Sequence, residues 1–120
     1  MKFDLTLSFI FLALSYQNCY KDQNRLPDAA IPVCIQKKID TIKAEPKWNP
    51  PAEVREYLYN GRRVFLFSSD CCDQFNQLYD SACQIICAPS GGFTGKGDNR
   101  CVDFLATAKE VRLVWKDDRK

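Results

Sequence analysis

The fold prediction for this chain depends mainly on the stretch from Val54 to Phe67, VREYLYNGRRVFLF. Two runs rich in aromatic and β-branched residues flank Asn60-Gly61. An Asn-Gly pair supplies the two positive φ angles that a type I′ hairpin turn requires. A two-residue turn places Tyr59 opposite Arg62 and fixes the pairing of the residues on either side of them. The stretch therefore predicts a β-hairpin of defined register.

The two faces of this hairpin differ in character. One face is mostly apolar, carries Glu56 and Arg63 as a diagonal ion pair, and suits packing beneath a helix. The other face mixes arginines and tyrosines with apolar residues, and we expect it to stay partly exposed to water. The first face holds Val54, Glu56, Leu58, Arg63, Phe65 and Phe67, and the second holds Arg55, Tyr57, Tyr59, Arg62, Val64 and Leu66.

Isoleucines recur at helical spacing before the hairpin. Four of them are separated by four, four and three positions, so they fall on one face of a helix. Pro32 suits the first turn of that helix, and Pro46 ends it. The run from Trp48 to Pro51 then predicts an extended linker, because proline restricts both itself and the residue before it. The four residues are Ile31, Ile35, Ile39 and Ile42.

Further elements follow the hairpin. Phe75 to Tyr79 and Cys83 to Cys87 predict a second hairpin around Asp80-Ser81-Ala82. Ser90 to Arg100 forms a glycine-rich loop, and Val111 to Trp115 is typical of a last strand. Together these elements predict an α+β domain, with one N-terminal helix packed on a small antiparallel sheet of four or five strands.

The cysteines predict an exported domain stapled by disulfides. The chain has seven cysteines and no histidine, and Cys19 stands apart from the other six. An even set in a small exported protein is typical of a disulfide framework, but spacing does not determine the pairing. We expect Cys71 and Cys72 to bond to two different partners, because a vicinal disulfide strains the peptide between them. The six domain cysteines are Cys34, Cys71, Cys72, Cys83, Cys87 and Cys101.

The N-terminus favours export. Leu5 to Tyr16 is a mostly apolar run of 12 residues, whereas a membrane-spanning helix needs about 20. The length matches the apolar region of a signal peptide. Two processing routes remain open: cleavage after Ser15, or lipidation of Cys19, which would leave an even set of cysteines.

The resulting domain organisation has three parts. We expect a signal peptide over residues 1–18, a flexible tether over 19–30 and a single disulfide-rich domain over 31–120. With Cys19 lipidated, the protein is a lipoprotein of the cell envelope and touches the membrane only through that anchor. Ordinary cleavage instead gives a soluble periplasmic or secreted protein.

Charge and composition exclude several classes of function. Seventeen basic against 15 acidic residues give a net charge of +2, and the charges are interspersed. No basic stripe indicates nucleic-acid binding. The lack of histidine excludes histidine-based triads, general bases and metal ligands. We expect a monomer with no cofactor and no catalytic residues.

The loop GGFTGKGD, residues 91–98, is the candidate binding loop. It is not a phosphate-binding P-loop, because Gly97 follows Lys96 where serine or threonine is required. Nor is it a dinucleotide fingerprint, because the pattern fails at Arg100. Its glycines suit a tight surface loop, and exposed loops on rigid scaffolds often bind partners. The candidate residues are Gly92, Phe93, Thr94, Lys96 and Asp98.

Two metal hypotheses have weaker support. Asp98, Asn99 and Asp103 supply oxygens that could bind calcium, although their spacing is not that of an EF-hand. Cys83 and Cys87 have a spacing compatible with zinc if the domain is reduced. Solvated carboxylates and structural disulfides are the simpler interpretations.

Four aromatic residues form one further candidate site. They could make a platform for a sugar or a peptide, and the simpler interpretation places them in the core or against the sheet. These residues are Trp48, Tyr57, Tyr59 and Trp115.

Several motifs together resemble a known family. The segments WNPPAEV, the NG hairpin, CCDQFNQLYD, ICAPSGGFTGKGD, CVDF and LVWKD occur in this order. They resemble a domain-of-unknown-function family of small exported proteins and lipoproteins from Gram-negative bacteria. The resemblance runs from about Cys34 to Asp117. The family has no established activity, so the resemblance implies localisation and domain extent rather than chemistry.

These observations lead to one functional expectation and two alternatives. We expect a non-enzymatic interaction module of the cell envelope or the medium that presents a loop or sheet face to a protein, peptide or glycan. The first alternative is a small disulfide-stapled inhibitor acting through the glycine-rich loop. The second is an enzyme that uses carboxylates or thiols.

Overall fold

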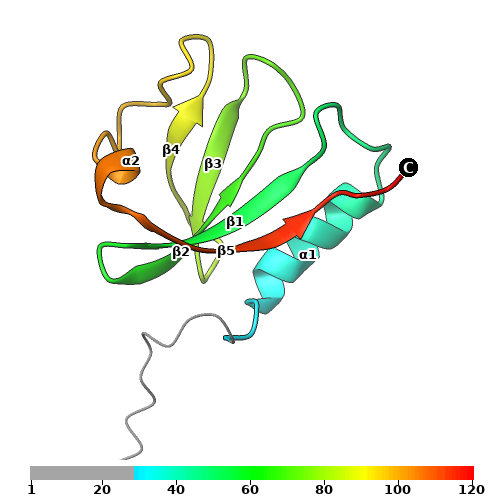
Figure 1. Cartoon of the computed structure of the whole chain (residues 1–120), viewed down its shortest axis with the longest axis horizontal. Coiled ribbons are helices and arrows are strands. Elements are labelled where there is room, and N and C mark those ends of the chain that lie inside the picture. The colour runs from blue at the N-terminus through cyan, green and yellow to red at the C-terminus, as the bar shows by residue number, and fades with distance from the viewer. Residues whose placement is uncertain (1–28) are drawn as a thin grey trace, which may run out of the picture.

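The computed structural model describes residues 29–120. The predicted signal peptide, most of the predicted tether and Cys19 lie outside the described residues. In the part described, five strands form one antiparallel sheet in the order β4-β3-β2-β1-β5 (Figure 1), so the predicted α+β class with disulfides is confirmed. The elements are α1 (Val33–Lys43), β1 (Glu53–Tyr59), β2 (Arg62–Phe67), β3 (Phe75–Asp80), β4 (Ile85–Gly91), α2 (Phe104–Thr107) and β5 (Lys109–Lys116).

The first hairpin has the predicted register. Asn60 and Gly61 both have positive φ, at 51° and 73°, as a type I′ turn requires. Tyr59 pairs with Arg62, and the ladder continues to Val54 opposite Phe67. A local turn signal and alternating side chains were therefore sufficient to fix this pairing.

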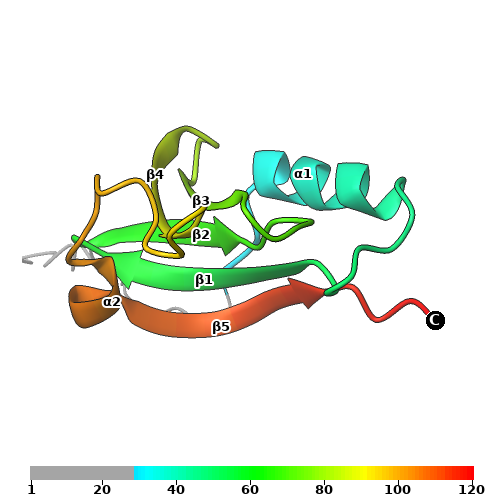
Figure 2. The same ribbon diagram turned by 90° about the horizontal axis from the view of Figure 1, so that it is seen from above.

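Helix α1 supplies one half of the core. It lies along one side of the sheet in Figure 2. Its isoleucines Ile35, Ile39 and Ile42 share one buried cluster with sheet residues such as Val54 and Phe65. This is the hairpin face that sequence alternation assigned to packing beneath a helix.

The opposite face of the hairpin is partly exposed, as expected, since Arg62 is exposed and Tyr57 and Leu66 are only partly buried, but it also carries a second core cluster. Val64 and Phe104 are at most 1% exposed. The ring of Phe104, from α2, packs edge-on against Tyr57 and Tyr59, with ring centroids 5.0 and 5.2 Å apart. The cluster itself was not expected, because its cover comes from α2, a short helix far along the chain that the sequence pattern does not predict. The cluster comprises Tyr59, Val64, Leu78, Cys87, Cys101 and Phe104.

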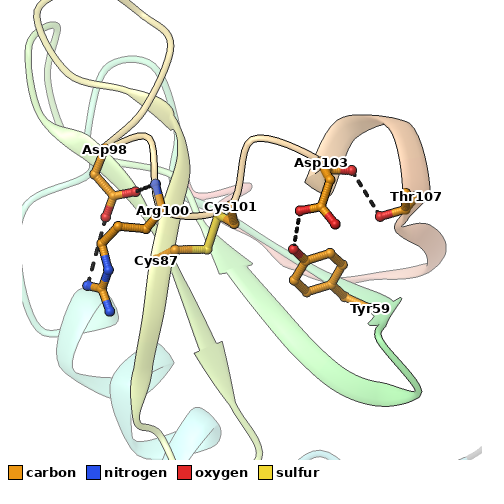
Figure 3. The surroundings of a disulfide bond; sticks show 7 residues. All are labelled: Tyr59, Cys87, Asp98, Arg100, Cys101, Asp103 and Thr107. Atoms are coloured by element: carbon orange, nitrogen blue, oxygen red, sulfur yellow. Dashed lines mark hydrogen bonds and ion pairs between the residues drawn. A yellow bond between two sulfur atoms is a disulfide. The ribbon is translucent and has the colours of Figure 1, made fainter.

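Three disulfides join the six domain cysteines. Cys34, in the first turn of α1, bonds to Cys83 in the turn between β3 and β4. A second bond joins β4 to the segment before α2 through Cys87 and Cys101 (Figure 3).

The third disulfide links the adjacent residues Cys71 and Cys72. The expectation that each would bond to a different partner was wrong. The other four domain cysteines already lie in two matching pairs, each with a Cα–Cα distance of 6.1 Å. Cys71 and Cys72 are both exposed on the loop between β2 and β3. Because the other four domain cysteines are already paired, these two bond to each other.

Glu56 is a fully buried carboxylate in the middle of β1. Its Oε1 accepts hydrogen bonds from Arg63 on β2, at 3.0 Å, and from Arg112 on β5, at 3.1 Å. The predicted diagonal pair of Glu56 and Arg63 is therefore part of a larger network, in which Glu56 also pairs with Arg112 and three strands are connected. The same two arginines also donate to the backbone carbonyl oxygens of Ala30 and Ala29.

Asp117 and Arg119 fasten the end of the described chain to α1. The Asp117 side chain is buried and accepts two hydrogen bonds from the Arg119 guanidinium, at 2.8 and 2.6 Å. These bonds lower the pKa of Asp117 to about 2. Arg119 also donates to the carbonyl oxygens of Lys43 and Glu45, at the C-terminal end of the helix.

Some element boundaries differ from the sequence-based expectation. β4 runs from Ile85 to Gly91, later than predicted, because Asp80 accepts backbone hydrogen bonds from Ala82 and Gln84 and so extends the turn. β5 is longer than predicted. The expected extended linker contains a cis peptide bond between Asn49 and Pro50. Within residues 29–120, no helix is long and apolar enough to cross a membrane.

Candidate functional site

A groove of about 410 Å³ lies between α1 and β3. Its floor is a row of every second residue on β3, namely Phe75, Gln77 and Tyr79, since alternate residues of a strand share a face. We call it the α1–β3 groove. Its lining residues are Lys38, Thr41, Ile42, Glu45, Trp48, Phe67, Ser68, Ser69, Asp70, Gln74, Phe75, Gln77 and Tyr79.

Aromatic rings provide the apolar surface of the groove. Tyr79 packs edge-on against Phe67, with ring centroids 5.2 Å apart, and the Lys38 ammonium lies 4.4 Å above its ring. Burial raises the pKa of Tyr79, so its hydroxyl stays protonated at neutral pH. Phe75 is 43% exposed. At the end of the groove near the C-terminus of α1, the Trp48 indole donates to Glu45 at 3.1 Å.

Polar side chains without partners converge on the same groove. In the region from 29 to 120, the side chains of Asp70, Gln74 and Gln77 make no hydrogen bond to protein. Amide side chains carry two donors and an acceptor, so both glutamines are available to a ligand. A groove that combines ring faces with a few unpaired polar groups has the composition of a small-molecule site.

The loop between β2 and β3 forms one end of this groove and contains the vicinal disulfide. Its first residues are fixed by backbone hydrogen bonds, from Ser68 to Glu53 and from Ser69 to the side chain of Asn76, both at 2.9 Å. Near its end, the Gln74 backbone donates to Cys71 at 3.1 Å. The disulfide between Cys71 and Cys72 therefore lies between two of the unpaired groups, Asp70 and Gln74.

This groove was not predicted from the sequence, although a signal for it exists. In FNQLY, residues 75–79, an aromatic, an amide and a second aromatic alternate on one strand face. Neither a buried nor a simply solvated face requires that pattern. Its partner wall, α1, ends more than thirty residues earlier, so the alternation alone could not show that the row borders a groove.

The glycine-rich loop, the predicted binding site, is arranged differently from the expectation. Phe93 is 90% exposed, and Thr94 and Lys96 are also exposed. In contrast, Gly92 is buried, and the Asp98 carboxylate accepts a hydrogen bond from the Arg100 backbone at 3.0 Å. The candidate residues are therefore not one continuous surface, and only the tip is available to a partner.

The buried part of this loop supports the α1–β3 groove. The Gly92 backbone donates to the Gln74 carbonyl oxygen at 2.9 Å. A Cβ atom at Gly92 would lie 2.4 Å from the Phe75 ring, so only glycine lets that ring pack against the loop. The glycine-rich loop and the groove are thus neighbouring parts of one structure.

Comparison with known proteins identifies the family. A family model described as "Domain of unknown function (DUF6970)" matches residues 40–117. The chain belongs to this family. The match includes the whole sheet, the loop with the vicinal disulfide and the glycine-rich loop. No curated protein and no solved structure matches the chain.

The acidic residues of the calcium hypothesis lie apart from one another in the DUF6970 domain. Asp98 lies beside Arg100 on one side of the disulfide between Cys87 and Cys101 (Figure 3). Asp103 lies on the other side, where it accepts a hydrogen bond from the Tyr59 hydroxyl that raises the pKa of Tyr59. Across residues 29–120, no group of three or more acidic or cysteine side chains is arranged to hold a metal ion.

The zinc pair is also separated in the DUF6970 domain. Cys83 bonds to Cys34, whereas Cys87 bonds to Cys101, so neither is a free thiolate ligand.

The four aromatic residues do not form a platform, and they pack against the core as the simpler interpretation expected. Trp48 and Trp115 pack against the cluster beneath α1, whereas Tyr57 and Tyr59 belong to the cluster on the opposite face of the sheet. Alternate residues of a strand share a face, so the hairpin register places Tyr57 and Tyr59 together. The two tryptophans lie outside the hairpin, and their side could not be derived from its register. Of the four residues, only Trp48 lines the α1–β3 groove.

Replacing Gly97 in the DUF6970 domain by alanine is expected to destabilise the fold by at least about 2 kcal/mol. Its φ is +77°, and a Cβ atom would lie 2.0 Å from the Ala88 carbonyl oxygen, which accepts a hydrogen bond from Asp98. Gly95→Ala is the matched control, because its φ is +75° but nothing lies within 4 Å of the added carbon. Urea denaturation of both variants measures the difference, and equal losses would contradict the steric explanation.

Proposed function

We propose that this chain is an exported, non-enzymatic binding module of the cell envelope, and that the α1–β3 groove is its binding site. The observation that carries the proposal is the lining of the groove. Exposed ring surface from Phe75 lies beside the unpaired side chains of Asp70, Gln74 and Gln77. Unpaired polar groups beside apolar ring surface are what a ligand needs for both orientation and affinity.

Export is supported by the cysteines and by the N-terminal sequence. All six domain cysteines are in disulfides, which persist in oxidising compartments. The apolar run from Leu5 to Tyr16 has the length of a signal peptide. We propose that lipidated Cys19 anchors the domain, with release as a soluble periplasmic or secreted protein as the alternative. The resemblance to small exported proteins and lipoproteins of Gram-negative bacteria agrees with either route.

A role without catalysis is supported by the chemistry of the chain. It has no histidine, and in the oxidised domain the six described cysteines are unavailable as thiolate nucleophiles. Of the acidic side chains in the groove, Glu45 accepts a hydrogen bond from Trp48. The groove is therefore better suited to holding a ligand than to transforming one.

A second candidate function is supported by the tip of the glycine-rich loop. Phe93 is 90% exposed, and the loop around it is closed by hydrogen bonds from Gly95 to Gly92, at 3.1 Å, and from Gly97 to Gly91, at 3.0 Å. The disulfide between Cys87 and Cys101 also spans this loop. A braced loop with one protruding apolar side chain suits insertion into the cleft of another protein, which is how an inhibitor would act.

Two substitutions separate these candidates. Binding of the full-length exported protein to panels of oligosaccharides and short peptides would be compared among the native chain, Gln77→Ala and Phe93→Ala. We expect Gln77→Ala to weaken binding, whereas Phe93→Ala leaves it unchanged. Loss of binding in Phe93→Ala alone would overturn the groove as the binding site and place that site at the tip of the glycine-rich loop, in favour of the second candidate. Binding that neither substitution alters would place the site elsewhere on the domain and contradict both candidates.

A further inference from the structure

We infer that the ligand of the α1–β3 groove is a short, uncharged oligosaccharide; this inference rests on the proposed function of the groove. Four features of the groove support it: its aromatic surfaces, the type of its polar groups, the presence of charges of both signs and its position over an interior strand.

Aromatic surface lies along the floor and at one end of the groove. Phe75 and Tyr79 alternate with Gln77 on β3, and Trp48 lies at the end near the C-terminus of α1. A pyranose ring has apolar C–H faces and hydroxyl groups around its edge. The Phe75 and Trp48 rings beside a side-chain amide match that division, because the rings contact the sugar faces while the amide reaches the hydroxyls. Lys38 covers the Tyr79 ring, so Tyr79 contributes its hydroxyl instead.

The unpaired polar groups suit hydroxyl partners. A sugar hydroxyl both donates and accepts a hydrogen bond, and so does each side-chain amide of Gln74 and Gln77. The neutral phenol of Tyr79 has the same property, since burial raises its pKa. Asp70 adds an acceptor at the loop end of the groove. None of these groups requires a charged ligand.

The groove carries charges of both signs. The cationic Lys38 lies above the Tyr79 ring, at 4.4 Å, and Glu45 already accepts a hydrogen bond from Trp48. Asp70 places a further negative charge in the lining. A uniformly anionic or cationic chain would meet repulsion at one of these positions, whereas a neutral chain would not.

The position of the groove argues against an extended peptide. Peptides that bind by strand addition use the free backbone groups of a sheet edge. β3 lies between β2 and β4, so its backbone groups already pair with neighbouring strands. From Phe75 to Tyr79 the strand rises about 13 Å, enough for roughly two or three sugar units.

Fluorescence of Trp48 provides a direct test. The chain has two tryptophans, so Trp115→Phe leaves Trp48 in the groove as the single reporter. In this background the full-length protein would be titrated with neutral trimers of β-1,4-linked glucose or N-acetylglucosamine. Parallel titrations would use a trimer of galacturonic acid and uncharged tetrapeptides.

We expect a saturable change with at least one neutral trimer and none with the acidic trimer. Gln77→Ala should weaken that binding by about tenfold, through loss of a hydrogen bond in a shielded site. Gln84→Ala is the matched control, because its side chain is exposed and outside the groove and its backbone hydrogen bonds are retained. Unchanged melting temperatures would show that both variants are folded.

Three outcomes would overturn the inference, and they separate it from the proposed function. Saturation by tetrapeptides alone, lost in Gln77→Ala, would overturn the oligosaccharide and leave the groove as a binding site. Equal binding of the acidic and neutral trimers would overturn the requirement for an uncharged ligand. Sugar binding that Gln77→Ala leaves unchanged would place the sugar elsewhere and contradict the inference and the proposed function together.

Discussion

Glu56→Ala is expected to lower the free energy of unfolding by about 3–5 kcal/mol, because it leaves two partly buried guanidinium groups without their shared carboxylate. Arg63 and Arg112 approach Glu56 from the two neighbouring strands, and each side chain is 23% exposed. The substitution also leaves a cavity in the middle of β1. Urea denaturation monitored by circular dichroism would measure the loss.

Two further variants make this prediction specific. Glu56→Gln keeps the shape and one acceptor oxygen but removes the charge, so it should cost less than Glu56→Ala. Glu110→Ala removes an exposed carboxylate that pairs with Arg55, and should cost no more than about 1 kcal/mol. A loss for Glu56→Ala that does not exceed the loss for Glu110→Ala would show that the buried network contributes little to stability.

Replacing both Cys34 and Cys83 by alanine is expected to destabilise the domain by about 4 kcal/mol, from loop-closure entropy alone. The two residues are 49 positions apart. The same relation gives about 3 kcal/mol for the bond between Cys87 and Cys101, which are 14 positions apart. Thermal unfolding of each double variant, without reductant, would measure both losses.

The vicinal disulfide supplies the control for this series. Cys71 and Cys72 are adjacent, so their bond closes almost no chain and constrains the unfolded state very little. Both side chains are exposed, and neither belongs to a core cluster. The double alanine variant at these positions should therefore unfold at nearly the native temperature. If it were the least stable of the three, loop closure would not explain how the disulfides stabilise this domain.

Local features of the fold could be predicted from the sequence, whereas long-range features could not. The Asn60-Gly61 turn fixed the first hairpin because the turn and the alternation on either side lie within one short stretch. The isoleucine spacing likewise located α1. The second core cluster was missed because it depends on Phe104, which is far along the chain from the tyrosines that it covers.

The same distinction explains the candidate site. The glycine-rich loop attracted a binding hypothesis because its glycines are conspicuous, yet Gly92 is required by the close Phe75 ring and Gly97 by close backbone packing. The α1–β3 groove needs two segments that are distant in sequence, residues 38–48 and 67–79, to come together, so no single motif indicates it. The pairing of Cys71 with Cys72 could not be predicted for a related reason, since it depends on where the other four cysteines lie in space.

The two attachments of α1 have a consequence for the thermodynamics of association. Cys34 holds the first turn of the helix to the β3–β4 turn, and Arg119 holds its last carbonyl groups. A wall fixed at both ends does not have to close around an incoming molecule, so little conformational entropy is lost when the groove is filled. Calorimetric titration should then show an entropic penalty that comes mainly from ordering the ligand. Shorter and stiffer molecules lose less entropy on binding, so they should compete better for the groove.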